Sequence, residues 1–424
     1  MAEEPRTSLT KIKEKNDGFL AIDHFCLLAK RLKNKVIWLQ RENFAKNEKY
    51  ISNNDICKIL ARSNDPDFRA LPAKVAQAVV KDVDEMYASF YALREKGMFA
   101  RPPKFSPKGE NGRFKVTFSN QAISSKAFKR GYIRPSGMDA EFLIPKYLKD
   151  DLKSVKDISE VRFVPKGICY QMEIVYSVYT AEYKDTGVYV GMDLGERNLI
   201  AMVSNVSTPV LIKSDVLRGI NEYYIALKSD AQEKLPKGVK SSKNIRRLNE
   251  KRNDKIMNGL HCLTNQLIDY FKHLQVSDVF IGWNKLIKCG INIGRNNNRK
   301  FVLLPHRKLI DILKYKCSEI GIRVHVIKES YTSLCSFVDD EEICFHEEYA
   351  GKRMGRLFRT KDGRIINADV NGAYNILRKG MGIKFSELDS RKVFSTPRVR
   401  KIDYGYNTNR FHMESNVNRF HTAA

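Results

Sequence analysis

The sequence predicts a multidomain α+β protein, with a helical module, a small antiparallel β-barrel and a C-terminal α/β domain in that order. Three observations support this prediction. Apolar residues recur at helical spacing through residues 1–100, they alternate with polar residues through 101–186, and strands and helices then follow one another through 187–380. The remaining residues, 381–424, are polar and basic, so we expect a partly disordered tail.

The first hundred residues are expected to form three helices. Apolar positions follow helical spacing from Phe19 to about Asn43, and residues 52–55 offer an N-cap for a short second helix. Pro72 falls in the first turn of a third helix, which Gly97 can close. Stripes of aromatic and aliphatic residues at this spacing are more typical of a core than of a ligand site, so we interpret this module as packed helices.

Strand-like alternation follows the proline-rich stretch that begins at Arg101. The candidate strands are short and apolar on alternate positions, and they span 114–118, 141–144, 161–164 and 168–179. Residues 165–167, Pro-Lys-Gly, form a good turn between the last two strands. We therefore expect a small antiparallel barrel over this stretch, with Lys and Arg in its loops.

The order of elements after residue 187 is the most informative part of the pattern. A hairpin around Asp193 gives two strands and residues 209–213 give a third, before a long helical insert over about 215–275. Two more strands then alternate with two helices, over 278–282, 305–321, 323–327 and 369–378. The order β-β-β-α-β-α-β-α matches the RNase H-like plan, in which a three-strand meander is extended by two α/β crossovers.

The charge balance indicates a polyanionic partner. Lys plus Arg number 75 against 49 Asp plus Glu, so the formal net charge is +26. Such a charge repels itself unless a polyanion is bound, and nucleic acid is the obvious candidate. The sequence has no apolar run that could span a bilayer and no amphipathic anchor, so no membrane partner is expected. Eight scattered cysteines are typical of an intracellular protein, in the cytoplasm or nucleoid of a prokaryote or the nucleus of a eukaryote.

Two aspartates are candidate catalytic and metal-binding residues. Asp193 lies inside an apolar strand, although it could instead cap the turn at Gly195. Asp369 opens a helix, where a plain first-turn acid is also favoured by the helix dipole. Two-metal phosphodiester cleavage requires two or three carboxylates gathered at one sheet edge, and the predicted topology brings these two there.

The third acid is absent from its usual place in such a site. The strand 278–282 ends in Gly282, and neither Trp283 nor Asn284 is acidic. Glu329 follows the neighbouring strand, and since strands lie about 5 Å apart, its side chain could reach the same metals. The alternative for Glu329 is a solvated loop residue. Asp278 is a weaker candidate, and the acidic residues 339–342 are expected to form an exposed loop.

Basic residues cluster in two stretches after the hairpin. The first is expected to form an arm that guides a nucleic-acid strand over the site, although a solvated helix face is the common meaning of such a run. The second is a polar loop that could close over single-stranded DNA. The candidate nucleic-acid-binding residues are Lys237, Lys240, Lys243, Arg246, Arg247, Lys251, Arg252, Arg295, Arg299 and Lys300.

Three blocks of sequence resemble the TnpB family, the transposon-encoded RNA-guided endonucleases related to miniature type V CRISPR effectors and Fanzor proteins. These blocks span 191–198 (GMDLGERN), 329–333 (ESYTS) and 367–375 (NADVNGAYN), the first and last being similar to the first and third RuvC motifs. Two shorter segments, 70–77 (ALPAKVAQ) and 282–285 (GWNK), are similar to the branch of the family with a relocated catalytic glutamate. By motif position, Asp193 and Asp369 match the two aspartates of the family, and Glu329 matches the relocated glutamate.

The resemblance implies a specific activity and set of partners. The helical module would be a recognition lobe, the β-rich module a wedge domain that grips the guide RNA, and the C-terminal domain a RuvC nuclease. The enzyme would use two Mg²⁺ ions, for which Mn²⁺ can substitute. Guided by RNA from the transposon end, it would cleave double-stranded target DNA beside a short adjacent motif.

The family's zinc finger is not intact in this sequence. The finger has two paired-cysteine knuckles before the last aspartate, whereas here that interval holds only Cys335, Cys344 and His346 and no CxxC. We therefore expect a metal-free loop.

Two other functions remain open from the sequence. The glycine at 282 is compatible with a nuclease-dead RNA-guided DNA-binding protein or repressor. A cut-and-paste transposase or junction nuclease acting without RNA is the other alternative, although such a transposase usually carries Glu rather than Asp on its final helix.

Overall fold

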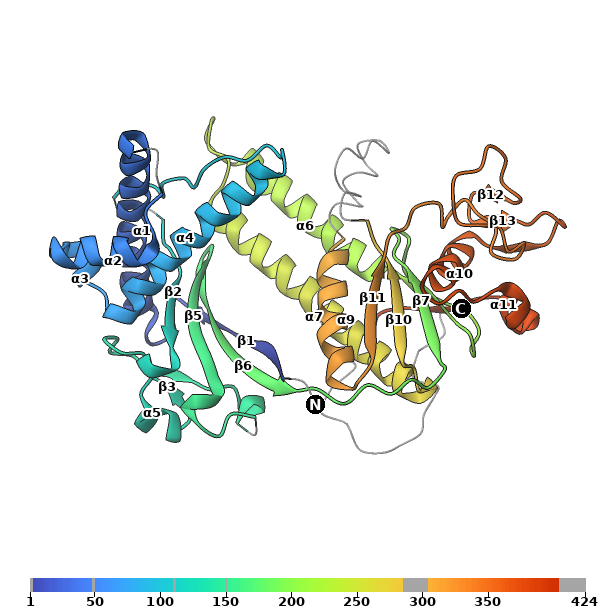
Figure 1. Ribbon diagram of the computed structural model, residues 1–424, viewed down its shortest axis with the longest axis horizontal. Helices are drawn as coiled ribbons and strands as arrows, with labels where there is room; N and C mark the ends of the chain where they lie inside the picture. The colour runs from blue at the N-terminus through green and yellow to red at the C-terminus, as the bar shows by residue number, and fades with distance from the viewer. Residues whose placement is uncertain (1–2, 48–49, 110–111, 150, 285–303, 404–424) are drawn as a thin grey trace. The chain divides into compact units, whose positions relative to one another are not determined.

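The computed structural model describes residues 3–47, 50–109, 112–149, 151–284 and 304–403 (Figure 1). The chain divides into two compact units, one of Glu3–Val178 and one that begins at Tyr179. We describe each unit by itself. None of the helices in the described residues is long and apolar enough to cross a membrane.

The helices of the N-terminal unit agree with the three expected from the sequence. Their bounds are α1 (Phe19–Asn47), α2 (Asn53–Arg62), α3 (Pro66–Arg69) and α4 (Ala73–Glu95). The side chain of Ser52 caps α2 by accepting a hydrogen bond from the Asp55 N–H, 3.2 Å away. Gly97 follows α4 with a φ of 69°, the left-handed conformation that glycine adopts readily. The sequence missed α3, because a four-residue helix is too short to show periodicity.

The strands of this unit form an open sheet, so the expected closed barrel is wrong for the described residues. The order is β1-β6-β5-β2, and a separate hairpin is formed by β3 and β4. The bounds are β1 (Glu3–Lys13), β2 (Val116–Ser119), β3 (Tyr132–Ile133), β4 (Phe142–Leu143), β5 (Ile158–Lys166) and β6 (Cys169–Tyr179). Short helical turns connect them, namely η1 (Asn120–Ala122), α5 (Ser125–Lys129), η2 (Lys146–Leu148) and η3 (Val155–Asp157).

One hydrophobic core joins the helices and the sheet of this unit. Ile22 and Val36 of α1 and Val79 of α4 belong to the same buried cluster as Phe118 of β2 and Phe163 of β5. The expected boundary near residue 100 therefore separates elements that fold as one compact unit. The first strand, β1, was not foreseen, because its alternate residues are charged or polar rather than apolar.

The second unit is built on a six-stranded sheet. Its bounds are β7 (Tyr189–Asp193), β8 (Asn198–Ser204), β9 (Val210–Lys213), β10 (Asp278–Gly282), β11 (Arg323–Ile327) and β15 (Arg398–Arg400). The strand order is β11-β10-β7-β8-β9-β15. The antiparallel meander β7-β8-β9 is extended by β10 and β11, which run parallel to β7 and to each other. The expected element order is confirmed, and β7 lies in the interior of the sheet, between β10 and β8.

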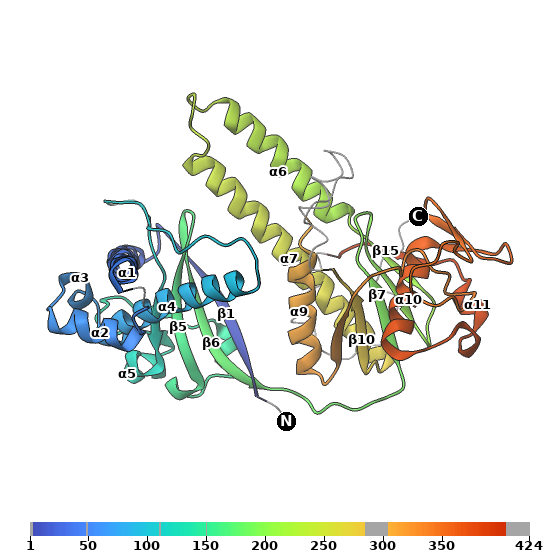
Figure 2. The same ribbon diagram turned by 45° about the horizontal axis from the view of Figure 1, so that its top comes forward.

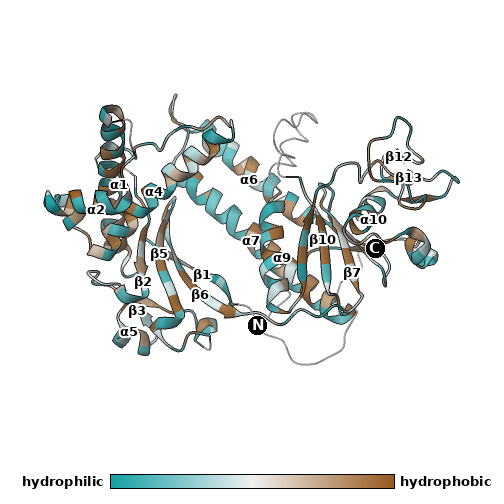
Figure 3. Cartoon of the chain, viewed as in Figure 1, coloured by the Kyte–Doolittle hydropathy of each residue, from teal (hydrophilic) through white to brown (hydrophobic). Residues whose placement is uncertain are grey.

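Helices cover both faces of this sheet (Figures 1 and 2). The bounds are α6 (Asp215–Glu233), α7 (Lys243–Leu274), α9 (His306–Glu319), α10 (Ala368–Met381), η4 (Phe385–Glu387) and α11 (Ser390–Val393). Met192 and Ile281 share a core with α7 and α9, whereas Phe280 faces α10. Because side chains alternate along a strand, Asp193 lies on the α10 face of the sheet. The middle residues of the buried strands are mostly apolar, and brown segments mark them in Figure 3.

Two regions outside the sheet core differ from the expectation. The interval expected to be a loop carries a three-stranded antiparallel sheet of β12 (Lys352–Met354), β13 (Leu357–Arg359) and β14 (Ile365–Asn367). The tail was expected to be partly disordered, and its described part, up to residue 403, is ordered and includes β15, which pairs with β9 and extends the sheet. Residues 404–424 lie outside the described residues.

Candidate active site

Asp193 is the last residue of β7, and its carboxylate rests on the first turns of α10. A Cβ atom built on Gly372 would lie 2.8 Å from Oδ2 of Asp193, so the absence of a side chain at Gly372 makes room for the carboxylate. Gly191, two residues before Asp193 on β7, also lets the strand approach α10, since a Cβ there would lie 2.5 Å from the Ala373 carbonyl oxygen. Two glycines, one on each element, therefore let the strand and the helix approach closely.

Glu329 occupies the place where a side chain of residue 282 would stand. Gly282 of β10 pairs with Ile327 of β11, and Glu329 follows two residues later. A Cβ atom built on Gly282 would lie 2.9 Å from Cγ and 3.1 Å from Oε1 of Glu329. The glutamate therefore lies over the end of β10 rather than in a solvated loop, as expected from the spacing of neighbouring strands.

Asp369 lies in the first turn of α10, where two side chains hold its carboxylate. The amide of Asn198 donates to Oδ2 over 2.8 Å, and the Arg353 guanidinium donates to Oδ1 over 3.0 Å. Asn367 caps the helix by accepting hydrogen bonds from the N–H groups of Asp369 and Val370. Neither Asn198 nor Arg353 could be selected from the sequence as a partner of Asp369, because the three residues meet only in the folded chain.

The electrostatics couple Asp193 to both other acids. Burial and, next, the negative charge of Asp369 raise the pKa of Asp193 to about 7, against the opposing effect of Arg353. Burial and, next, the charge of Asp193 raise the pKa of Glu329 to about 7. Desolvation and like charges both disfavour the ionised forms, and either a bound proton or a nearby positive charge relieves this cost.

The chemistry of this donor set fits Mg²⁺ or Mn²⁺. All the candidate ligands are carboxylate oxygens, which these hard cations prefer. As the side chains stand, no group of three His, Cys, Asp or Glu residues in the described part of the chain is close enough to hold a metal ion. Arg353 forms an ion pair with Asp369 and balances its charge. Among the described residues, Asp193 and Glu329 have no such ion pair, and their pKa values are raised. Asp193, Glu329 and Asp369 are the residues that would hold the metal.

Asp193→Asn is expected to stabilise the metal-free protein, and the gain should grow with pH. The pKa of an aspartate in an unfolded chain is about 3.9, whereas the pKa of Asp193 in the native protein is about 7. Between these two values the native protein binds a proton that the unfolded chain does not. The stability associated with that proton is present below about pH 4 and is lost as pH rises toward 7. The asparagine variant avoids this loss, which is on the order of 2–4 kcal/mol at pH 8.

The measurement is the difference in melting temperature between variant and wild type, in EDTA, at pH 4.5 and pH 8. Asp230→Asn is the matched control, because Asp230 is an exposed residue of α6 paired with Lys234. A difference that does not change with pH would contradict the burial of a titrating Asp193.

Other acids weighed from the sequence have structural roles. Asp278 lies at the opposite end of β10 from Gly282 and accepts hydrogen bonds from Tyr183 and His325. The expected exposed acidic loop at 339–342 is wrong in part. The carboxylate of Glu341, only 7% exposed, accepts hydrogen bonds from the backbone N–H groups of Ser336 and Ala350 and so folds that loop.

The residues of the zinc-finger interval form a hydrogen-bonded loop. The Cys335 thiol donates to the Cys344 carbonyl oxygen over 3.6 Å, and Sγ of Cys344 lies 3.4 Å from Nε2 of His346. Both cysteines are free. The expectation of a metal-free loop stays a prediction.

The first basic stretch lies on a helical hairpin made by α6 and α7 (Figure 2). Six of its candidate residues are exposed on the turn and on the first turns of α7: Lys237, Lys240, Lys243, Arg246, Arg247 and Lys251. Arg252 is a correction to the expected binding set. It is half-buried, its Nε donates to Asn221 over 2.8 Å, and it joins α7 to α6. Arg295, Arg299 and Lys300 lie outside the described residues.

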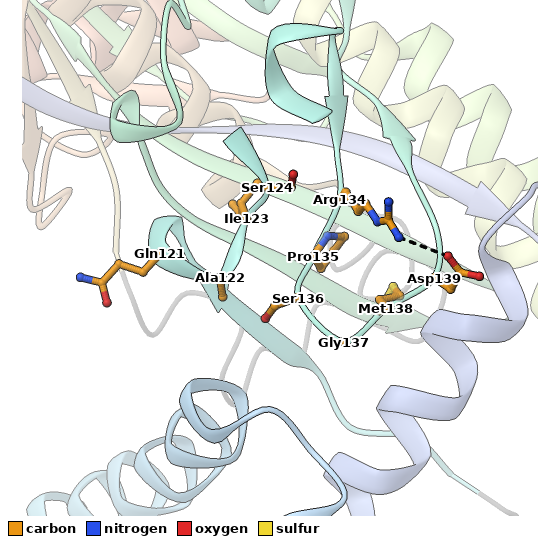
Figure 4. A pocket seen from close by; sticks show the side chains of 10 residues that line it. All are labelled: Gln121, Ala122, Ile123, Ser124, Arg134, Pro135, Ser136, Gly137, Met138 and Asp139. Atoms are coloured by element: carbon orange, nitrogen blue, oxygen red, sulfur yellow. Dashed lines mark hydrogen bonds and ion pairs between the residues drawn. The ribbon is translucent and has the colours of Figure 1, made fainter. Parts of the chain in front are cut away.

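The N-terminal unit contains an open pocket that is separate from the carboxylates. Residues 121–124 and 134–139 line its volume of about 470 Å³ (Figure 4). Its charged side chains are Arg134 and Asp139, which form an ion pair of 3.4 Å. A single paired acid offers no catalytic arrangement, so the carboxylates at the end of β7 are the better candidate for an active site.

Two family models match the parts of the chain that hold these acids. The family model of the Cas12f1-like TNB domain matches residues 306–376, and the model of the OrfB/IS605 probable transposase matches residues 168–288. Asp193 lies in the second match, and Glu329 and Asp369 lie in the first. A TnpB-like protein, ORF457 of Acidianus two-tailed virus, is 27% identical over 146 residues, which are 34% of this chain but only 29% of that relative.

Solved structures share the fold at low sequence identity. The Cas12f1 protein in a complex with sgRNA and target DNA has a TM-score of 0.52 and 15% identity, covering 84% of this chain and 82% of its own. The mini-RNA-guided endonuclease CRISPR-Cas_phi3 has a TM-score of 0.46 and 11% identity, covering 89% of this chain and 92% of its own. The likeness to the Cas12f1 protein, with its TM-score above 0.5, shows that the fold is of the same mixed α/β, multidomain kind. Two family models thus match the parts of the chain that carry the three acids, and a TnpB-like protein is similar to part of the chain.

Proposed function

We propose that this protein is an RNA-guided DNA endonuclease that hydrolyses phosphodiester bonds at Asp193, Glu329 and Asp369. The observation that carries the proposal is the convergence of these acids. They come from the end of β7, the loop after β11 and the start of α10, and the charge of Asp369 raises the pKa of Asp193 while the charge of Asp193 raises that of Glu329. Residues far apart in the sequence gather here at the edge of a sheet, although burying like charges together is costly. Such a cost is typical of a functional site.

The cofactor that this site would take is a pair of Mg²⁺ ions, for which Mn²⁺ can substitute. Bound divalent ions supply an activated water and stabilise the leaving oxygen. The chain's own contribution is to hold the three carboxylates in a mostly buried setting. Asn198 and Arg353 orient Asp369, and the glycines at 191, 282 and 372 make room for the acids and the helix.

The partners we propose are a guide RNA from the transposon end and double-stranded target DNA that bears a short adjacent motif. The net charge of +26 supports nucleic-acid partners. The exposed lysines and arginines of the α6–α7 hairpin would contact a phosphate backbone, whose recognition does not depend on sequence. The N-terminal unit would supply the recognition and wedge functions. The structural relative with sgRNA and target DNA in its complex is consistent with the same partners.

One observation favours the nuclease-dead alternative. Arg353 is already paired with Asp369, 3.0 Å away, and a permanent ion pair there would compete with a metal ion. An RNA-guided binding protein with this pair would keep its basic surfaces and bind a target without cutting it. A cleavage assay separates the two functions.

The chain co-expressed with its flanking transposon DNA is expected to co-purify with one discrete RNA. That RNA should direct cleavage of a plasmid that carries a matching target, in the presence of Mg²⁺ but not of EDTA. A plasmid without the match is the control. Binding of the matched plasmid without any cleavage would favour the nuclease-dead protein, whereas sequencing that finds no discrete RNA would contradict guidance by RNA altogether.

A further inference from the structure

Helix α10 presents a row of polar side chains to the loop that carries Glu329. Asn371, Asn375 and Lys379 are spaced four residues apart, so they lie on one face of the helix. We call these three residues the α10 ladder. The loop that faces them spans residues 328–337, and it starts directly after β11.

The ladder binds backbone atoms on both sides of Glu329. Nζ of Lys379 donates to the carbonyl oxygens of Lys328 and Ser330, over 3.0 and 3.3 Å. Nδ2 of Asn375 donates to the carbonyl oxygens of Thr332 and Cys335, over 2.9 and 2.7 Å. The peptide groups before and after Glu329 are thus held by the same helix.

Asn371 completes the attachment at the far end of the loop. Its Nδ2 donates to the Cys335 carbonyl oxygen over 2.9 Å, and its Oδ1 accepts from the Phe337 N–H over 3.0 Å. Asn371 and Asn375 are both fully buried. A buried amide is costly unless its hydrogen bonds are made, so the loop and the helix specify each other's position.

The loop needs this external support because its own conformation is strained. Tyr331 has a φ of 65°, in the left-handed region that a non-glycine residue adopts at a cost of about 1 kcal/mol. Within the turn, the Thr332 hydroxyl donates to the Glu329 carbonyl oxygen over 2.9 Å, and the backbone N–H groups of Thr332, Leu334 and Cys335 donate to carbonyl oxygens of the same turn. These local contacts shape the turn, and the α10 ladder attaches it to the helix.

We propose that the α10 ladder positions the Glu329 carboxylate over Gly282, so that the helix that begins with Asp369 also sets the place of the third acid. Lys379 and Asn375 are positioning residues, since they touch the loop backbone and not the reacting atoms. This inference rests on the proposed function only for the identity of Glu329 as a metal ligand. The part that does not depend on the proposed function is that α10 holds the loop, and with it Glu329, at a fixed distance.

Lys379 is the residue to test, because it is exposed on the last turn of α10 and can be changed without opening the core. Lys379→Met is expected to raise the dissociation constant for Mg²⁺ about tenfold, the size of effect seen when a group supporting a metal ligand is lost. Binding is measured calorimetrically on the purified full chain, and cleavage with the guide-loaded complex should show the same shift in half-saturating Mg²⁺. Lys379→Arg keeps donors in reach of the carbonyls and should restore the wild-type value. Lys384→Met, at an exposed lysine just beyond the helix, is the matched control.

A double-mutant cycle separates positioning from a direct role in nucleic-acid binding. In a Glu329→Gln background, Lys379→Met should change Mg²⁺ binding less than twofold, because the group that it positions is already gone. An equal loss of Mg²⁺ affinity in both backgrounds would overturn the proposal. So would a Lys379→Met variant that loses affinity for target DNA and keeps its affinity for Mg²⁺. The calorimetric result stands even if the wild type does not cleave DNA, so failure of the proposed function is distinguishable from failure of this inference.

Discussion

Asp193→Ala is expected to reduce the rate of guided DNA cleavage by about three orders of magnitude or more. The charge of Asp369 raises the pKa of the Asp193 carboxyl, and the charge of Asp193 in turn raises the pKa of Glu329, so Asp193 is the acid linked to both others. Loss of a metal ligand would remove several kcal/mol of transition-state stabilisation, and each ~1.4 kcal/mol corresponds to a factor of ten in rate. The measurement is a single-turnover time course on a labelled target with saturating Mg²⁺ and guide RNA.

The variant should still bind guide RNA and target DNA as tightly as the wild type, which a gel-shift titration checks. Asp230→Ala, at an exposed residue of α6, is the control for removal of an aspartate elsewhere. If Asp193→Ala cleaved within tenfold of the wild-type rate, the reaction would occur somewhere other than at the end of β7.

Glu329→Gln is expected to slow cleavage by about two to three orders of magnitude. Glutamine has the shape of glutamate and fits the space over Gly282, so the loop should keep its conformation. The change removes one negative charge and one good oxygen ligand from a site that gathers three. The single-turnover rate is again the quantity measured, now across a titration of Mg²⁺, because a weakened site would show a raised half-saturating concentration as well as a lower maximum.

Glu342→Gln provides the comparison, since Glu342 is an exposed glutamate in the same segment of chain. Full cleavage by the Glu329 variant would show that the third acid lies elsewhere, and the relocated-glutamate assignment would have to be abandoned. A rate loss shared equally by Glu342→Gln would point to a general effect of charge on DNA binding.

Much of the site could be predicted because strand spacing and element order constrain it. The order of elements placed Asp193 on an interior strand, and the sheet has that strand between β10 and β8. Because residue 282 is not an acid, the third carboxylate was expected from the adjacent strand. Gly282 pairs with Ile327 of that strand, and Glu329 lies two residues after Ile327. A period-two pattern and a distance of about 5 Å between strands were sufficient for that inference.

What escaped prediction has a common physical cause. Arg353 lies on β12, a three-residue strand whose residues are all exposed, so no apolar periodicity marks it. Asn198 begins β8 after a short turn, and only the paired geometry of the sheet and α10 brings it to Asp369. The run of acidic residues at 339–342 resembled a solvated loop. The side chain of Glu341 is instead mostly buried and accepts hydrogen bonds from backbone N–H groups, which no local sequence pattern reveals.

The glycine at the end of β10 restricts how such a site can change over time. A Cβ atom there would lie 2.4 Å from Cδ1 of Ile376 and 2.9 Å from Cγ of Glu329, so acids at both positions require these two side chains to shift. A lineage that exchanges one arrangement for the other can pass through an ancestor carrying both acids only if the packing around Ile376 and Glu329 changes first. The shift from one strand to its neighbour therefore demands coordinated substitutions, and intermediates with incomplete metal sites would be expected along that route.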